Sequence, residues 1–235
     1  MRKFAIKLKE NEAAVDVRKT TNTVAVKSDK GLYEAKAVII ASGKKTRELG
    51  VPGEKEFKNK GLTYCVTCDG PLFLGKDVAV IGGGNSALDA AIQLIKIANR
   101  IYIVNIAAAL TGDKIMQETT EANKGVTVFN NSRVTAVLGD RMVNAIDINR
   151  GGKEERLAVG GVFVEVGLIP NSDFARDVDK NELGEIRVNC RNETSIPGIF
   201  AAGDVTDVPE KQIVIAAGEG SKAALSAFRY LIGHE

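Results

Sequence analysis

The amino-acid sequence predicts an α/β protein built around one mononucleotide-binding β-α-β unit, with strand-rich segments on both sides of it. Three consecutive patterns near the middle of the chain carry this prediction. The apolar run Asp77–Ile81 is typical of a strand buried on both faces, and Gly82-Gly83-Gly84 follows it directly. Apolar residues then recur at helical spacing from Leu88 to Ala98, and Ile101–Val104 is expected as the next strand.

Short strands are predicted on the N-terminal side of this unit. Residues 24–29 (VAVKSD) and 37–41 (AVIIA) are rich in β-branched side chains. The second run is continuous enough to be buried on both faces. Ser42-Gly43 ends that run, and Pro52-Gly53 marks a loop.

Beyond the unit, residues 126–166 alternate between strand-forming runs and turns. The runs are VTVFN, RVTAVLG, VNAIDINR and GVFVEVG, and Gly139-Asp140 and Gly151-Gly152 are expected as hairpin turns. A further strand is predicted at Gly198–Ala202, followed by a helix of small residues from about Gln212 to Leu231.

Composition and charge exclude several classes of function. The 235 residues include 32 basic and 30 acidic side chains, a net charge of +2 with both signs mixed, so we expect neither nucleic acid nor membrane as the main partner. No apolar run approaches the ~18 residues that span a bilayer, and no apolar region follows the charged N-terminus as in a secretory signal. Three cysteines and one histidine cannot make a disulfide framework or a zinc site, so no metal is expected. These features predict a cytoplasmic, nucleotide-handling protein.

The loop Gly82-x-Gly84-x-x-Ala87 lies where a dinucleotide fingerprint belongs, between a buried strand and a helix. Gly82 allows the tight turn, Gly84 lets the backbone approach a pyrophosphate, and Ala87 keeps helix and strand close. The helix start at Asn85 and Ser86 supplies unpaired N–H groups and the positive end of the helix dipole. We therefore expect this loop to bind a nucleotide; a tight turn without a ligand is the alternative.

The segment YCVTCDGP contains the side chains best suited to redox chemistry, two cysteines and an aspartate. Cys65 and Cys68 have the spacing of a small reversible disulfide, especially at a helix start, where the dipole lowers the pKa of a thiol. Half a zinc site and two inert buried thiols are the alternatives. Asp69 could donate a proton to a leaving thiolate, or it could form an N-cap or an Asx turn to Gly70. Cys190 is expected to be a surface or packing residue in a polar strand.

Five segments, in this order, resemble the low-molecular-weight thioredoxin reductases, and within them most closely the flavoprotein subunits of alkyl hydroperoxide reductase. They are ASG (41–43), CVTCDGPLF, VAVIGGGNSALDAA, GVFVEVGLIPN and GIFAAGDVTDVPEKQIVIAAGEGSKAALSAF. The likeness is collinear from about residue 30 to the end. It implies a Rossmann-like pyridine-nucleotide domain inserted in a partial FAD-binding domain, of the three-layer ββα type. Residues 74–167 would form the NAD(P)H-binding domain, with the CxxC just before its entry, and residues 1–73 and 168–235 the FAD-binding part.

The resemblance also implies a flavin site. Gly203 and Asp204 match the motif whose aspartate binds the ribityl–pyrophosphate part of FAD. Lys211, Gln212 and Ile213 match the stretch that lies against the isoalloxazine, at the start of a helix whose dipole favours reduced flavin.

For the redox segment, the resemblance implies a role for each residue. Cys68 matches the cysteine next to the flavin, Cys65 the one that exchanges with the substrate disulfide, and Asp69 the acid. Electrons would pass from NAD(P)H through FAD to Cys65–Cys68 and on to a thioredoxin- or peroxiredoxin-type protein disulfide. A homodimer and a rotation of the two domains against each other are implied as well.

The sequence also predicts which nicotinamide cofactor fits. NADPH-using members of the family place two arginines just past the second strand of the unit, where this chain has Ile106 and Ala107. A 2′-phosphate there would be desolvated without a counter-charge. NADH-using members place a carboxylate for the ribose hydroxyls, and Asn105 offers an amide oxygen instead. We expect NADH to be preferred over NADPH.

The chain departs from the family in one respect that bears on FAD. Family members begin with a strand and a G-x-G-x-x-G loop that hold the ADP half of FAD, and this sequence has no match to them. We therefore expect weak or absent FAD binding by this chain alone. Two alternatives to an active reductase stay open: a truncated, inactive homologue or fragment that binds a nucleotide or partner chain, and half of a split enzyme.

Overall fold

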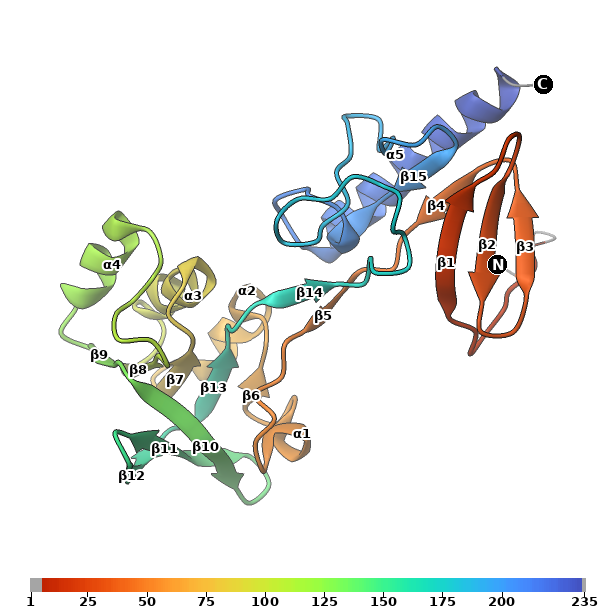
Figure 1. Ribbon diagram of the computed structural model, residues 1–235. Helices are drawn as coiled ribbons and strands as arrows, with labels where there is room; N and C mark the ends of the chain where they lie inside the picture. The colour runs from red at the N-terminus through yellow and green to blue at the C-terminus, as the bar shows by residue number, and fades with distance from the viewer. Residues whose placement is uncertain (1–5, 234–235) are drawn as a thin grey trace. The chain divides into compact units, whose positions relative to one another are not determined.

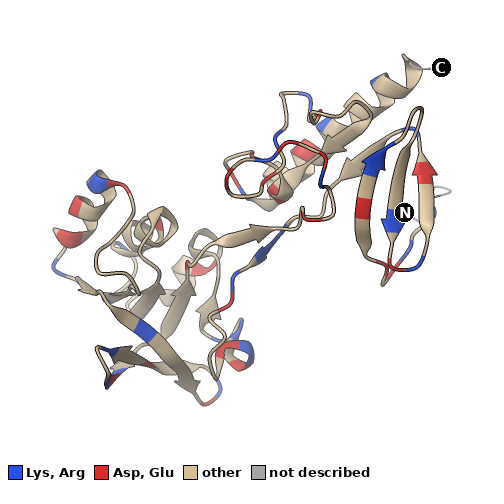
Figure 2. Cartoon of the chain, in the orientation of Figure 1, with Lys and Arg blue, Asp and Glu red and all other residues tan. Residues whose placement is uncertain are grey.

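The computed structural model describes residues 6–233. The chain folds into two compact units: one consists of residues 1–45 and 168–235, the other of residues 46–167 (Figure 1). Charged side chains of both signs are spread over both units (Figure 2). Within residues 6–233, no helix is long and apolar enough to cross a membrane.

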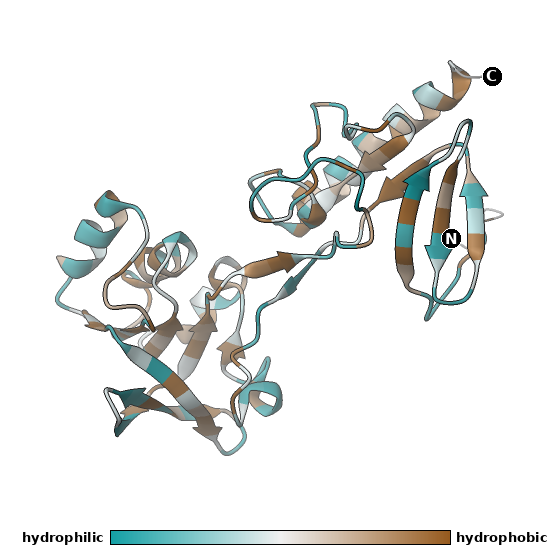
Figure 3. Ribbon diagram, viewed as in Figure 1, coloured by the Kyte–Doolittle hydropathy of each residue, from teal (hydrophilic) through white to brown (hydrophobic). Residues whose placement is uncertain are grey.

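The second unit is built on a five-stranded parallel sheet with the strand order β6-β13-β7-β8-β9. The strands are β6 (Leu62–Thr63), β7 (Asp77–Ile81), β8 (Arg100–Val104), β9 (Val126–Phe129) and β13 (Gly161–Val164). All four residues of β13 are buried, as are four of the five in β7. These strands are largely hydrophobic in Figure 3, as expected for a sheet covered on both faces.

Alternate side chains of the central strand β7 enter two different cores. Val78 and Val80 pack with the helical layer, formed by α3 (Asn85–Leu94) and α4 (Lys114–Glu121). Ala79 and Ile81 pack on the opposite face of the sheet, against the antiparallel sheet β10-β11-β12. That sheet consists of β10 (Ser132–Gly139), β11 (Val143–Arg150) and β12 (Lys153–Ala158). The second unit therefore has three layers, two of sheet and one of helix.

Residues 46–73, which the sequence analysis placed with the first unit, pack in the second. They form α1 (Glu54–Phe57), β6, α2 (Val66–Asp69) and the 3₁₀ turn η1 (Gly70–Phe73). Glu54 is 2% exposed and accepts hydrogen bonds from the N–H groups of Leu49 and Gly50 and from the Tyr64 hydroxyl. Burial and this bond raise the pKa of Tyr64. Phe57 and Leu62 join the core between the two sheets, which fixes the segment there.

The first unit contains two small sheets and one long helix. Strands β1 (Ala14–Lys19), β2 (Val24–Ser28) and β3 (Leu32–Ala35) form an antiparallel sheet. Strand β4 (Val38–Ile40) pairs in parallel with β15 (Ile199–Ala201), next to η2 (Gly203–Val205) and α5 (Ile213–Ile232). The short strands β5 (Lys44–Thr46) and β14 (Leu168–Pro170) pair where the chain passes between the units.

The predicted α/β class is confirmed, and the strands and helices named from the sequence are present. Several further elements were not predicted, among them β1, β3, α1, α4 and β12. Strand β12 was not expected because four of its six residues are charged; it is the partner of β11 across the Gly151-Gly152 turn. Ile39 is 39% exposed, so β4 is not buried on both faces: its described sheet has only two strands. Cys190 is exposed, as expected of a surface residue, but lies in a turn rather than a strand.

Packing against β13 gives the first testable prediction. A Cβ atom on Gly161 would lie 2.3 Å from Cδ1 of Phe73, a buried ring packed edge-on against Phe163. Gly161→Ala should therefore lower the free energy of unfolding by roughly 1–3 kcal/mol, the usual cost of overpacking. Gly160→Ala is the matched control, since its Cβ would meet only the flexible Lys76 side chain at 3.2 Å. Urea unfolding of both variants is the measurement; equal stability would contradict the packing argument.

Candidate nucleotide pocket and redox pair

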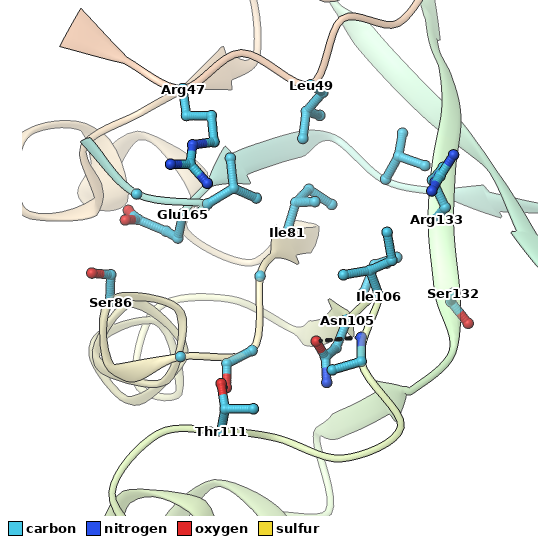
Figure 4. Close-up of a pocket in the computed structure, with 18 of the residues that line it drawn as sticks. Arg47, Leu49, Ile81, Ser86, Asn105, Ile106, Thr111, Ser132, Arg133 and Glu165 are labelled. Carbon is cyan, nitrogen blue, oxygen red and sulfur yellow. Dashed lines mark hydrogen bonds between the residues drawn. The ribbon is translucent and has the colours of Figure 1, made fainter. Parts of the chain in front are cut away.

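The second unit has a pocket of about 710 Å³ at the carboxyl ends of β7, β8 and β13 (Figure 4). The Gly82-Gly83-Gly84 loop forms one wall, Asn105 and Ile106 after β8 form another, and Glu165–Gly167 after β13 a third. This edge of a parallel sheet is where α/β proteins bind their ligands. The glycine loop predicted from the sequence to bind a nucleotide lies at this edge.

The glycine loop makes one close backbone approach, at Gly82, and is open at Gly84. Gly82 has φ = 138°, and a Cβ atom there would lie 2.4 Å from the carbonyl oxygen of Glu165, so only glycine fits. Ala87 is fully buried and lies beside Gly82, which keeps α3 close to the sheet. At Gly84 a side chain would meet nothing nearer than 3.9 Å, so this residue leaves the pocket open at the start of α3. Gly82, Gly84 and Ala87 thus have the geometry that the fingerprint requires.

The start of α3 is available to an anion. Gly84 is the N-cap and no side chain caps the helix, so backbone N–H groups of its first turn are left for a ligand. Ser86 is exposed and lines the pocket. The Asn85 side chain lines it too, and its oxygen accepts a hydrogen bond from the backbone of Asp113 at 2.6 Å.

Asn105 is buried and its side chain makes three hydrogen bonds within the protein. Its side chain is 3% exposed and fits under Gly83, whose Cβ would lie 2.4 Å from the Asn105 Oδ1 atom. The amide donates to the carbonyl of Ala109 and to Asn130, both at 2.8 Å, and accepts from the N–H of Ala107 at 3.1 Å (Figure 4). The amide therefore holds the loop after β8, and Asn105 also lines the pocket.

Glu165 is a pocket residue that the sequence analysis did not select. It follows β13 and lines the pocket together with Arg47 and Ser86 (Figure 4). Burial, with a smaller contribution from the negative charge of Asp89, raises the pKa of Glu165 from 4.5 to about 7. A single acidic residue in the apolar run GVFVEVG, just after the strand, was the available signal.

Cys65 and Cys68 are joined by a disulfide at the start of α2, as the spacing predicted. Cys65 is the N-cap of the helix, and its sulfur accepts a hydrogen bond from the N–H of Cys68 at 3.2 Å. Cys68 is exposed and Cys65 half-buried. Helix dipole and amide both stabilise negative charge on the Cys65 sulfur, so Cys65 is the better thiolate of the two after reduction.

Asp69 lies one residue beyond the pair and is held by a buried threonine. The Thr63 hydroxyl donates to the Asp69 carboxylate and also accepts from the N–H of Cys65 at 3.3 Å. Asp69 is the N-cap residue of η1, but its side chain makes no capping hydrogen bond to that turn. Thr63 thus links the expected acid to the backbone of the expected nucleophile.

The residues matched to a flavin motif lie together in the first unit. Gly203, with φ = 74°, and Asp204 form the turn η2 after β15. Gln212 is the N-cap of α5 without a side-chain bond to the helix, and Ile213 is 90% exposed at its first turn. Lys211 precedes them and donates to the carbonyl of Thr206 at 2.6 Å.

A buried ion triad fixes Lys211. Glu185 accepts hydrogen bonds from Lys44, Asn181 and Lys211, and its side chain is 8% exposed. Desolvation raises the pKa of Glu185, but these bonds outweigh it and hold the pKa below its ordinary value. Desolvation lowers the pKa of Lys211, partly opposed by the bond to Glu185. One carboxylate thus serves two lysines, an arrangement that nothing in the sequence pattern indicated.

These residues fit one half of FAD. The uncapped start of α5, with its exposed Ile213, offers N–H groups and an apolar surface to a flavin ring, and Asp204 offers an acceptor for hydroxyl groups. Within residues 6–233 the only strand–glycine loop–helix unit is the one at Gly82. The described part of the chain therefore presents no second loop for the ADP half. It also holds no cluster of histidine, cysteine or acidic residues that could bind a metal.

Comparison with known proteins agrees with this arrangement. The chain is 45% identical over 224 residues to the F subunit of alkyl hydroperoxide reductase from Staphylococcus aureus, covering 93% of this chain and 44% of that protein. It is 46% identical over 204 residues to an NADH dehydrogenase of Bacillus subtilis, covering 86% of this chain and 40% of that protein. The chain thus spans less than half the length of these curated relatives.

Solved structures match at the level of the fold. Thioredoxin reductase from Streptococcus pyogenes superposes with a TM-score of 0.88 at 36% identity, over 94% of this chain and 73% of that one. Thioredoxin reductase from Giardia duodenalis gives a TM-score of 0.88 at 32% identity, over 94% and 74%. The resemblance inferred from the sequence is confirmed. Residues 2–220 match the family model, and the chain belongs to the pyridine nucleotide-disulphide oxidoreductase family.

Proposed function

We propose that this chain carries the nucleotide-binding and disulfide-exchange parts of an NAD(P)H-dependent flavin disulfide reductase. The observation that carries the proposal is that one sheet edge holds both parts. Cys65 follows the carboxyl end of β6, and the Gly82 loop follows the carboxyl end of β7, with β13 between these strands. Relatives in this family are FAD- and NAD(P)H-dependent oxidoreductases. When bound, FAD supplies two-electron transfer between a nicotinamide and a disulfide.

The dinucleotide would lie across this edge with its pyrophosphate at Gly84 and the first turn of α3. In doubly wound sheets the adenosine lies beyond the strand that follows the glycine loop, here β8. The nicotinamide half would then extend toward β13, where Glu165 lies. In this proposal residues 74–167 are the NAD(P)H-binding domain and the first unit contributes to FAD binding.

Cys65 and Cys68 have separate roles in the proposed exchange. The Cys65 thiolate, stabilised at the start of α2, attacks the substrate disulfide, and Cys68 then attacks Cys65 to release the reduced product and re-form the disulfide. Asp69 donates the proton that the leaving substrate thiolate needs. Relatives named thioredoxin reductase and alkyl hydroperoxide reductase point to a thioredoxin- or peroxiredoxin-type protein disulfide as substrate. The cytoplasmic location and the homodimer remain predictions.

Reversible formation of the Cys65–Cys68 disulfide tests the core of this proposal. Thiol counting before and after a mild reductant should differ by two per chain, because the pair is partly exposed. Cys190→Ser is the matched control and should leave this difference at two, since Cys190 is unpaired. Cys65→Ser combined with Cys68→Ser should abolish it. A pair that stays reduced under oxidising conditions would refute the redox assignment.

FAD binding by the chain alone should be weak. Each charge-assisted hydrogen bond to the pyrophosphate contributes ~1.5–3 kcal/mol, and the described residues supply no second glycine loop to make them. Dialysis of protein reconstituted with FAD should therefore remove the visible absorbance of bound flavin. Stoichiometric flavin surviving dialysis would mean that the half-site at Asp204 and α5 is sufficient.

NADH should bind more tightly than NADPH, because Ile106 and Ala107 place no positive charge after β8. Ile106 is 65% exposed and lines the pocket, so an arginine there can reach the ligand. Ile106→Arg with Ala107→Arg should shift the preference toward NADPH by roughly tenfold or more. Calorimetric titration with both nucleotides measures it; tighter binding of NADPH to the unmodified chain would contradict the expected preference.

Glu165 should make stability depend on pH. Its pKa in the folded protein, about 7, lies above the ordinary value of 4.5, so the charged form destabilises the fold. The free energy of unfolding should be highest below the ordinary pKa and fall by up to about 3 kcal/mol as the pH rises through the folded pKa, at ~1.4 kcal/mol per pKa unit. Glu165→Gln should remove this loss, and Glu48→Gln, an exposed carboxylate in the same pocket, should not. Urea unfolding of the three proteins at about pH 5 and about pH 8 measures the difference.

A further inference from the structure

A second hollow, of about 460 Å³, adjoins the nucleotide pocket. Ile106, Ser132 and Arg133 line both of them, so the two cavities meet at these residues. Its remaining lining is polar and comes from Asn131, Thr135 and Asn149. The nucleotide pocket thus has a polar extension at the carboxyl end of β8.

Two backbone hydrogen bonds fix β10 at this place. The N–H of Ser132 donates to the carbonyl of Asn105, and the N–H of Asn131 donates to the carbonyl of Ala107, both at 2.9 Å. The start of β10 is therefore tied to the loop after β8. Arg133 follows at once and is exposed between two buried neighbours, Ser132 and Val134.

Arg133 has a charge that the protein itself does not use. Among the described residues, no carboxylate forms an ion pair with Arg133 and no acceptor takes a hydrogen bond from its guanidinium, whereas Arg18 and Arg156 are both paired. In the described part of the chain, Arg47 is the only other basic residue lining either hollow, and Figure 4 shows it on the side of the pocket away from Arg133. The end of the pocket next to Ile106 therefore has one cation.

We propose that Arg133 is a specificity-determining residue that binds a phosphate on the 2′-oxygen of the adenosine ribose, so that the site accepts NADPH as a second, weaker ligand. This inference rests on the proposed function, because it takes the adenosine to lie beyond β8. A guanidinium pairs with phosphate through two parallel hydrogen bonds, which a ribose hydroxyl cannot match. Arg133 thus replaces, from β10, a positive charge that Ile106 and Ala107 do not supply.

A neighbouring carboxylate keeps this affinity low. Glu154 accepts hydrogen bonds from Thr135 at 3.0 Å and from Asn149 at 2.8 Å, and both of these side chains line the second hollow. Its negative charge opposes that of a phosphate at Arg133. Arg133 and Glu154 therefore act in opposite directions on NADPH and leave NADH nearly unaffected.

The test is calorimetric titration of the full chain with NADH and with NADPH. Arg133→Met should weaken NADPH by roughly tenfold or more and NADH by less than about threefold, since only NADPH loses a charge-assisted contact. Glu154→Gln should tighten NADPH a few-fold and leave NADH unchanged. Arg141→Met, in the exposed turn after β10, is the matched control and should change neither.

The outcomes separate this inference from the proposed function. Wild-type chain that binds neither nucleotide overturns both. Wild-type chain that binds NADH, with Arg133→Met leaving NADPH unchanged or weakening both nucleotides equally, overturns the role of Arg133 alone. Adenosine 2′,5′-bisphosphate should compete with NADH, and the Arg133→Met variant should lose that competition; competition that persists in this variant also counts against the assignment.

Discussion

Parallel pairing of β13 with β6 on one side and β7 on the other is the constraint on which the second unit depends. Strand β13 (Gly161–Val164) lies far along the chain from β6 (Leu62–Thr63) and β7 (Asp77–Ile81), and the parallel sheet brings the carboxyl ends of all three to one edge. The CxxC helix, the glycine loop and Glu165 each follow one of the three strands. Pairing in this register therefore brings three loops to the same edge of the sheet, and the close packing of Gly161 against Phe73 leaves no room for a side chain on β13 there.

The glycine loop shows how packing and binding share the same residues. Gly82 and Gly83 are required by contacts inside the protein, with the backbone of Glu165 and the amide of Asn105, while Gly84 faces open space. Two glycines thus serve the fold and one serves access to the pocket. In the redox segment a single residue has both roles. Thr63 is buried in the sheet, and its hydroxyl also donates to Asp69 and accepts from the N–H of Cys65.

Local patterns predicted much of this, and long-range contacts account for what they did not. The βαβ unit, the glycine loop and the disulfide could be predicted because each rests on residues close together in the chain, such as Cys65 and Cys68. Strand β12 could not be predicted, because its charged side chains are exposed and its extended conformation depends on pairing with β11. The Lys44–Glu185–Lys211 triad has no sequence signature, since its members come from separate elements of the first unit. The place of Arg133 beside Ile106 has none either, because β10 reaches the loop after β8 only in the folded unit. The loop-holding bonds of the Asn105 amide could not be predicted either, because its partners Ala109 and Asn130 become neighbours only in the folded chain.

The buried amide of Asn105 has a consequence for how such a site can evolve. An aspartate or glutamate at this position would lose the two N–H donors that Ala109 and Asn130 require, so each such change would cost stability before it could gain selectivity. Exposed positions around it, Ile106 and Arg133, carry no such penalty. Under the proposed function, substitutions that change coenzyme preference are therefore expected in the loop after β8 and at the first residues of β10, and not at Asn105 itself.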